Sequence, residues 1–173
     1  MIDKTFLNLN DKEYNFDNLI GNTELKSLAL NFYEINDDIL NIINQLNNLE
    51  TITFNFCTVK SENIKLENHL KQIILTYTNI DFKIFNCKDT LIELEILNDE
   101  EDNIEVDIKD LLEFKNIEVL RIYNSKVKNS AEINKFKKLK ELFLDGSLVD
   151  EKKFMEIISS QLNFTYRKEY LFD

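Results

Sequence analysis

The sequence has 173 residues, of which 43% are hydrophobic, and it carries a formal net charge of −11. The thirteen Phe and six Tyr residues argue against disorder, and the length suits one domain with a substantial core. The negative charge argues against non-specific binding to nucleic acid or to an anionic membrane, because phosphate contacts need Lys and Arg.

The first residues lack the basic and apolar regions of a secretory signal, and no hydrophobic run is long enough to span a bilayer. The two cysteines, Cys57 and Cys87, form no CxxC motif, which is typical of free thiols in a reducing compartment. We therefore expect a cytoplasmic protein. No proline-rich or glycine-rich linker divides the chain, so a single domain over residues 1–173 is predicted.

Residues 1–24 are predicted to form an N-terminal cap. Thr5–Leu9 has the alternation of a strand that turns Leu7 and Leu9 inward. Gly21 suits the left-handed position that ends a short helix.

One hydrophobic pattern recurs six times in the following region, which we expect to span residues 25–161. Each copy has apolar residues at its positions one, four and six, a spacing that fits neither an exposed strand nor a helix. The copies begin at Leu25, Leu49, Leu70, Leu91, Ile117 and Leu139. A short strand over positions three to seven would point positions four and six inward and positions three, five and seven outward.

Position eleven is apolar in five of the copies, as Ile35, Val59, Ile80, Val127 and Val149. The fourth copy has Glu101 at this position and is longer than the others. We therefore expect an insertion there, with Ile104 taking the place of the missing apolar residue.

The repeated pattern resembles the leucine-rich repeat, LxxLxLxxNxL. The resemblance implies an α/β solenoid of about eight coils, with a parallel sheet on its concave side and short helices or turns on its convex side. It also implies that the residue at position nine turns inward and bonds backbone groups of a neighbouring coil. That position holds Tyr33, Cys57, Thr78, Asp99, Ser125 and Ser147.

The segments that return between strands differ in length. Asp37–Asn48 and Asp150–Leu162 have helical hydrophobic stripes, with Asp37 as the expected N-cap of the first. The shorter segments Lys60–His69 and Asp81–Thr90 are predicted to form single turns. Residues 162–173 alternate between aromatic and polar residues and predict a C-terminal capping strand, or alternatively an edge that pairs with a second copy.

No motif predicts catalysis, a cofactor or a metal, and we expect no enzyme. The only histidine, His69, lies in a predicted turn, and the acidic stretch Asn98–Asp107 lacks the spacing of a calcium loop. Charge is nonetheless uneven. Glu93–Glu113 has a net charge of −9 and Phe114–Lys140 one of +6, so these regions either orient a partner or attract each other.

The outward side of the predicted sheet holds the candidate partner-binding residues. Position eight of the first three copies places Phe32, Phe56 and Tyr77 in a row, with Ile74 nearby. Arg121, Tyr123 and Phe143 form a second, weaker cluster. Aromatic residues at outward positions are typical interface anchors, although the row could instead stack on itself and close the edge of the core.

The resemblance implies protein–protein recognition on the concave face. We expect a bacterial inhibitor or adaptor that binds a basic protein, without direct contact to nucleic acid or membrane, as a monomer or weak homodimer. The alternative is an acidic mimic of nucleic acid that blocks a nucleic-acid-binding protein. Binding by a mimic would be lost in moderate salt and would not need Phe56 or Tyr77.

Overall fold

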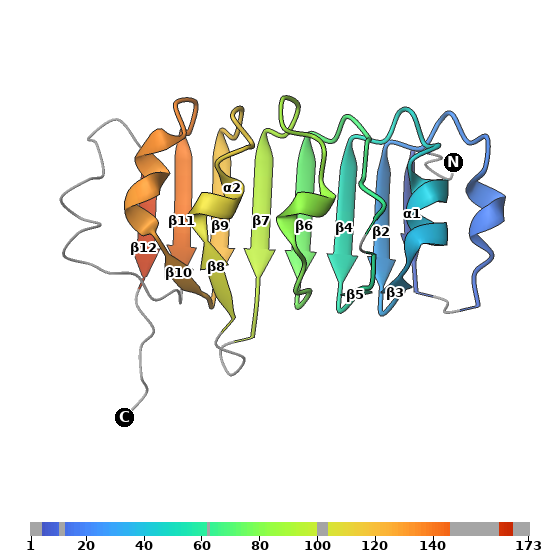
Figure 1. Cartoon of the computed structure of the whole chain (residues 1–173), viewed down its shortest axis with the longest axis horizontal. Coiled ribbons are helices and arrows are strands. Elements are labelled where there is room, and N and C mark those ends of the chain that lie inside the picture. Colours follow the sequence, from blue (N-terminus) through green and yellow to red (C-terminus); the bar gives the residue numbers. More distant parts are fainter. Residues whose placement is uncertain (1–4, 11–12, 62, 100–103, 146–162, 168–173) are drawn as a thin grey trace.

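The computed structural model describes residues 5–10, 13–61, 63–99, 104–145 and, for the backbone, 163–167. Eight parallel strands form one sheet in the order β1-β2-β4-β6-β7-β9-β11-β12 (Figure 1). Their bounds are β1 (Phe6–Leu9), β2 (Ser27–Asn31), β4 (Thr51–Asn55), β6 (Gln72–Thr76), β7 (Glu93–Leu97), β9 (Val119–Tyr123), β11 (Glu141–Asp145) and β12 (Asn163–Arg167).

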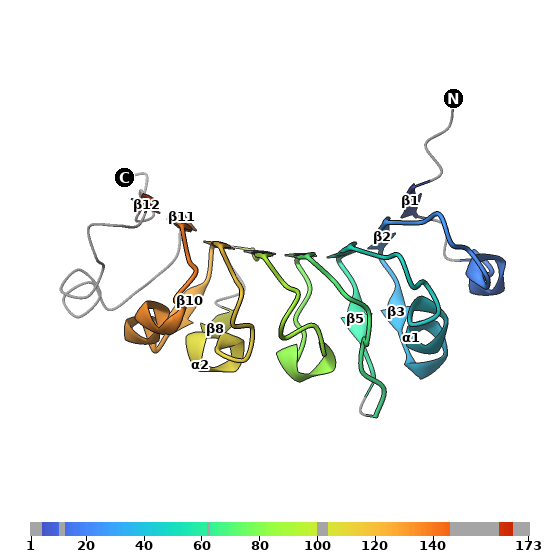
Figure 2. The same ribbon diagram turned by 90° about the horizontal axis from the view of Figure 1, so that it is seen from above.

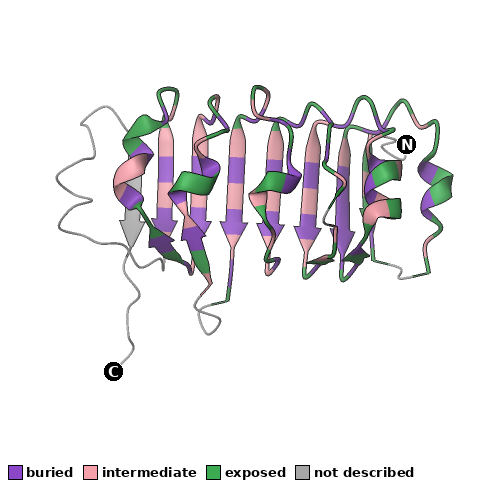
Figure 3. Ribbon diagram, viewed as in Figure 1, coloured by how far each residue is buried: buried purple, intermediate pink, exposed green. Residues whose placement is uncertain are grey.

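The register of the sheet confirms the repeat. Equivalent positions of successive copies lie side by side, as in the pairs of Leu28 with Ile52 and of Ile52 with Ile73. The six residues at position four are all fully buried, namely Leu28, Ile52, Ile73, Leu94, Leu120 and Leu142. Burial alternates along β4, β6, β7, β9 and β11, with positions four and six inside (Figure 3). The sequence therefore forms the predicted leucine-rich repeat solenoid.

The second side of the solenoid consists of short elements. Two small parallel pairs, β3 (Glu34–Ile35) with β5 (Thr58–Val59) and β8 (Glu105–Asp107) with β10 (Lys126–Lys128), follow the main strands. The helices are α1 (Asp37–Ile43) and α2 (Ile108–Leu111), with 3-10 turns η1 (Phe16–Leu19), η2 (Phe82–Ile84) and η3 (Ser130–Lys135). Figure 2 shows the sheet curving away from these elements, so that they lie on its convex side.

Helix α1 begins differently from the prediction. The N-cap is Asn36, whose extended backbone lets its side-chain oxygen accept a hydrogen bond from the Ile39 amide at 3.0 Å, and not Asp37. Asp37 instead lies in the first turn, where the helix dipole favours a negative charge. The helix ends at Ile43, and the side chain it buries most deeply besides Ile43 is Leu40.

The insertion in the fourth copy also differs from the prediction. Val106, and not Ile104, takes position eleven, because β8 aligns Val106 with Val127 on β10. Val106 is buried, whereas Ile104 is only half-buried and offers its carbonyl oxygen to the Lys126 amide at 2.9 Å. The backbone pairing with the next coil therefore sets the length of the insertion.

At Cys57 and Thr78, position nine acts between coils as the resemblance implied. The Cys57 thiol donates to the carbonyl oxygen of Leu30 at 3.3 Å, and the Thr78 hydroxyl lies 3.2 Å from that of Phe54. Both carbonyls belong to position six of the preceding coil. The Cys57 thiol thus has a structural role between coils, and burial raises its pKa.

The ends of the solenoid agree in part with the sequence. Strand β1 buries Leu9 and half-buries Leu7, and Gly21 follows η1 with a φ of +78°. Strand β12 aligns Asn163–Arg167 with Glu141–Asp145 and is the last strand in the sheet order. The predicted helix at Asp150–Leu162, Ser147 and Val149 lie outside the described residues, so the domain boundaries stay a prediction.

Candidate functional site

The concave face of the sheet changes character halfway along. The outward residues of the first three full coils are uncharged, namely Ser27, Ala29, Asn31, Thr51, Thr53, Asn55, Gln72, Ile74 and Thr76. The outward residues of the next three coils include Glu93, Glu95, Arg121, Glu141 and Asp145. We call these surfaces the uncharged half and the charged half.

The uncharged half ends in a row of aromatic side chains, Phe32, Phe56 and Tyr77, which we call the aromatic ridge. The Phe32 and Phe56 rings stack with centroids 5.1 Å apart and planes at 14°, and Phe56 and Tyr77 stack at 4.5 Å and 23°. Phe32 and Phe56 remain 55% and 49% exposed. The rings therefore stack on one another, which was the alternative to partner binding in the sequence analysis. They still present a large apolar surface to solvent.

The backbone of the ridge adopts an unusual conformation. Phe32, Phe56 and Tyr77 have φ values of 63°, 51° and 47°, in the left-handed region that aromatic residues rarely enter. Their amides hold this conformation by donating to the next coil, as the Phe56 amide does to the Thr76 carbonyl at 2.8 Å. Asn124 occupies the same position in the charged half with a φ of 51°, and asparagine is a residue type that tolerates such a φ.

The preference of the backbone therefore does not explain why aromatic residues occupy these positions. A left-handed conformation costs roughly 1–2 kcal/mol for an ordinary residue, whereas each stacked pair contributes about 0.5–1.5 kcal/mol. The two stacked pairs thus offset only part of the conformational cost of the three left-handed residues. The sequence contained one signal for this geometry: position eight of the repeat holds Asn124 and Gly146, residue types that tolerate a left-handed backbone. The spacing of the hydrophobic residues does not show it.

A ladder of asparagines lies beside the ridge and was not predicted. Asn55 Nδ2 donates to Asn31 Oδ1 at 2.7 Å, and Asn31 Nδ2 donates to Asn8 Oδ1 at 2.6 Å and to the Leu9 carbonyl at 2.9 Å. The consensus of the leucine-rich repeat has asparagine at position nine, whereas Asn31 and Asn55 occupy position seven. The ladder fixes side chains on the concave surface next to Phe32 and Phe56.

Arg121 is the centre of the second candidate cluster and is already engaged within the chain. Its guanidinium pairs closely with Glu93 and lies 3.8 Å from a Glu95 oxygen and 3.9 Å from a Glu141 oxygen. It also lies 5.3 Å from the centroid of the Phe143 ring, a cation–π geometry. The structure therefore brings Arg121 and Phe143 together in an internal network.

Tyr123 lies on the same strand, one outward position beyond Arg121, and is half-buried. Burial raises the pKa of the Tyr123 hydroxyl, and the Glu95 carboxylate adds to this effect. Ile74 is the middle residue of β6, the strand of the uncharged half that borders β7, and is also half-buried. Of the seven candidates, the three ridge residues thus form the most exposed contiguous set.

The uneven charge distribution found in the sequence is partly compensated within the chain. Lys88 pairs with Glu113, and Glu105 pairs with both Lys126, at 3.1 Å, and Lys128. With the Arg121–Glu93 pair, the two Glu105 contacts join the acidic and basic regions across neighbouring coils. The mutual attraction of the two regions is therefore realised in the structure.

Among the described residues, the histidine and the second cysteine show no arrangement typical of a catalytic or metal site. His69 is exposed, and burial raises the pKa of the Cys87 thiol to about 12. Within the described ranges, no three His, Cys, Asp or Glu side chains are grouped as metal ligands would be. The helices of the described part are all too short or too polar to cross a membrane.

Comparison with known proteins supports the fold and goes no further. No protein family model and no curated protein sequence matches the chain. Among solved structures, the chain is similar to an internalin from Listeria monocytogenes, with a TM-score of 0.54 and 19% sequence identity. The match covers 83% of this chain and 44% of the internalin chain, so the chain spans less than half the length of that protein. The repeat register and this similarity together show that the chain has the leucine-rich repeat fold.

Proposed function

We propose that the chain is a protein-recognition module that binds another protein on its concave face, with the aromatic ridge as the anchor. The observation that supports this proposal is the ridge itself: stacked, half-exposed rings at backbone positions where asparagine would cost less. Exposed aromatic residues beside a fixed polar surface are typical of binding hot spots. Ile74 extends this apolar contact on β6.

The partner that fits the whole concave face has an apolar segment and a basic segment. The charged half has four carboxylates, of Glu93, Glu95, Glu141 and Asp145, against the single guanidinium of Arg121. With the net charge of −11, this excess would attract a basic protein and orient it along the sheet. In this proposal Tyr123 and Phe143 contact the basic segment, and the module acts as an inhibitor or adaptor in a bacterial cytoplasm.

The test is a capture experiment with a variant that removes the ridge and preserves the backbone. Phe32, Phe56 and Tyr77 are replaced together by Asn, because Asn124 shows that this repeat accepts Asn at the same left-handed position. Wild type and variant are immobilised and exposed to lysate of the source organism, after circular dichroism and thermal unfolding have shown that both are folded. We expect a captured protein that the wild type holds and the Asn variant loses.

The matched control is Asn124→Ala, which changes the same position of the repeat in the charged half and should retain the partner. Retention by the ridge variant, with release in moderate salt, would contradict the proposal and favour the acidic mimic of nucleic acid. Retention by the ridge variant in both low and high salt would place the binding surface elsewhere and contradict both functions.

A further inference from the structure

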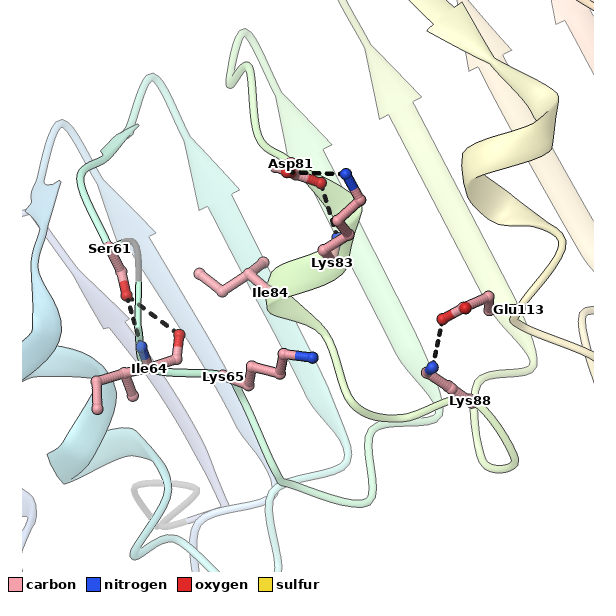
Figure 4. Close-up of a pocket in the computed structure, with 8 residues that line it drawn as sticks. All are labelled: Ser61, Ile64, Lys65, Asp81, Lys83, Ile84, Lys88 and Glu113. Atoms are coloured by element: carbon pink, nitrogen blue, oxygen red, sulfur yellow. Dashed lines mark hydrogen bonds and ion pairs between the residues drawn. The ribbon is translucent and has the colours of Figure 1, made fainter.

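A hollow on the convex side lies where the return segments are shortest. Helices α1 and α2 cover the coils on either side, whereas Lys60–Leu70 has no helix among its described residues and η2 is only three residues long. The hollow between these two segments has a volume of about 610 Å³. It is lined by Ser61, Ile64, Lys65, Asp81, Lys83, Ile84, Lys88 and Glu113 (Figure 4). We call it the convex hollow.

The base of the convex hollow is held by backbone hydrogen bonds between the two coils. The Leu66 amide donates to the Ile84 carbonyl at 2.7 Å, and the Asn86 amide donates to the Leu66 carbonyl at 2.9 Å. On one wall, the Ser61 hydroxyl accepts from the Ile64 amide at 3.2 Å and closes a tight turn. Bonded backbone therefore holds together the two segments that line the hollow.

The charge in the convex hollow is opposite to that of the whole chain. Three lysines face two carboxylates, in a protein with a net charge of −11. Lys88 pairs with Glu113, and Lys83 lies 3.8 Å from Asp81 in a pair so exposed that it adds little stability. Lys65 makes no ion pair with any described residue, and Figure 4 shows its side chain extending along the hollow past Ile84.

A second observation supports a positive potential in this place. The pKa of the Glu113 carboxyl is lowered, first by its hydrogen bond from Lys88 and then by the charges of Lys88, Lys65 and Lys115. Three lysines thus act on the one carboxylate at the rim. Beside them, the half-buried Ile64 supplies an apolar surface, and Ile84, which is 7% exposed, adds a small one.

We propose that the convex hollow binds a small organic anion, a carboxylate or a phosphate monoester, whose charged end meets Lys65 and whose apolar body lies on Ile64 and Ile84. The volume is in the range of small-molecule sites, roughly 300–1,000 Å³. A lysine attracts carboxylate and phosphate oxygens alike, as a flexible point charge, so the shared chemistry is an anionic group on a small apolar body. This site lies on the opposite side of the sheet from the aromatic ridge and does not depend on the proposed function.

The experiment is a titration followed by NMR of isotope-labelled isoleucine methyl groups. Phenyl phosphate and phenylacetate are added separately to the whole chain, with phenol as the uncharged control and inorganic phosphate as the control without an apolar body. We expect saturable shifts of the Ile64 and Ile84 methyls with at least one organic anion, and at least fivefold weaker binding of phenol and of inorganic phosphate. The stronger of the two organic anions identifies the anionic group that the site prefers.

Two substitutions make the test specific. Lys65→Gln should weaken the binding at least fivefold, because it removes the ammonium group that pairs with no carboxylate among the described residues. Lys140→Gln removes a lysine that pairs with Glu118 away from the hollow and should change the affinity less than twofold. Equal affinities of wild type and Lys65→Gln, equal shifts with phenol, or shifts that never saturate would overturn the proposal. The ridge variant with Asn at positions 32, 56 and 77 should bind the anion like wild type, so that failure of either proposal is recognised separately.

Discussion

The uncharged and charged halves of the concave face share one interior and differ in their outward residues. In both halves, positions four and six are aliphatic or Phe and are buried almost completely. Outward, β2, β4 and β6 have no charged residue, whereas β7, β9 and β11 have four carboxylates and one arginine. Because the inward residues alone satisfy the packing of the coil, the outward ones can be chosen for the surface that they create.

The two halves also differ in how they fill the left-handed positions that follow β2, β4, β6 and β9. Asn124 fills it in the charged half with a side chain suited to that backbone, while Phe32, Phe56 and Tyr77 fill it with rings that stack on one another. The charged half stabilises its surface by ion pairs around Arg121, and the uncharged half by stacking and the asparagine ladder. Apolar surface is thus exposed mainly where charge is absent.

Because both halves share one interior, substitutions at the buried position four should cause the largest loss of stability, and the loss should be the same in both halves. Leu28→Asp in the uncharged half and Leu120→Asp in the charged half each bury a carboxylate among aliphatic side chains, and each should cost more than about 4 kcal/mol of unfolding free energy. Both variants should be largely unfolded by circular dichroism, since domains of this size are stable by only about 5–15 kcal/mol. A folded Leu120→Asp protein would show that the assigned inward direction is wrong.

The charged half should depend on Arg121 for part of its stability. Arg121→Gln leaves Glu93, Glu95 and Glu141 close together without their cation and should cost about 1–2 kcal/mol in urea unfolding at low salt. The loss should shrink in 1 M salt, because screening weakens the repulsion among the partly exposed carboxylates. Thr53→Gln, an outward change of the uncharged half, serves as the control and should show no salt-dependent loss.

The ridge should be more tolerant of Asn than of Ala. Phe56→Asn and Phe56→Ala both lose two stacked neighbours, but Asn adopts the left-handed backbone more readily, so the Asn variant should be more stable by about 1 kcal/mol. Thermal unfolding of the two variants measures this difference. Asn124→Ala should lose a similar amount relative to wild type in the charged half. Equal stabilities of Phe56→Asn and Phe56→Ala would mean that the backbone conformation is not what distinguishes the ridge.

The smallest effect concerns the acid stability of the convex side behind the charged half. Hydrogen bonds from Lys128 and Lys126, together with their charges, lower the pKa of the Glu105 carboxyl. A carboxyl whose pKa is lower in the folded state stabilises the fold above its usual value, near 4.5, and loses this contribution as the pH falls through that value and below. Urea unfolding at pH 6 and pH 3 should therefore show a greater loss of stability for wild type than for Glu105→Gln. Parallel losses in the two proteins would rule out this role of Glu105.

The inward residues of the repeat were predictable because they form a column that is independent of distant contacts. Leu28, Leu94 and Leu120 share position four, and a strand that is apolar at alternate positions has only one way to bury them. The expected helices were less accurate. The N-cap of α1 is Asn36 and not the expected Asp37, since the cap depends on which side chain reaches the free amides of the first turn.

The sequence by itself determined the coil, its register and the line of the aromatic ridge, because each of these follows from a short spacing that is repeated six times. Only the tertiary structure decided that Arg121 is engaged by carboxylates of neighbouring strands, that Val106 replaces Ile104 and that a hollow with lysines opens on the convex side. These features depend on contacts between coils, where residues about 20 to 28 positions apart meet. Their geometry is set by the stacking of whole coils, which no local pattern records.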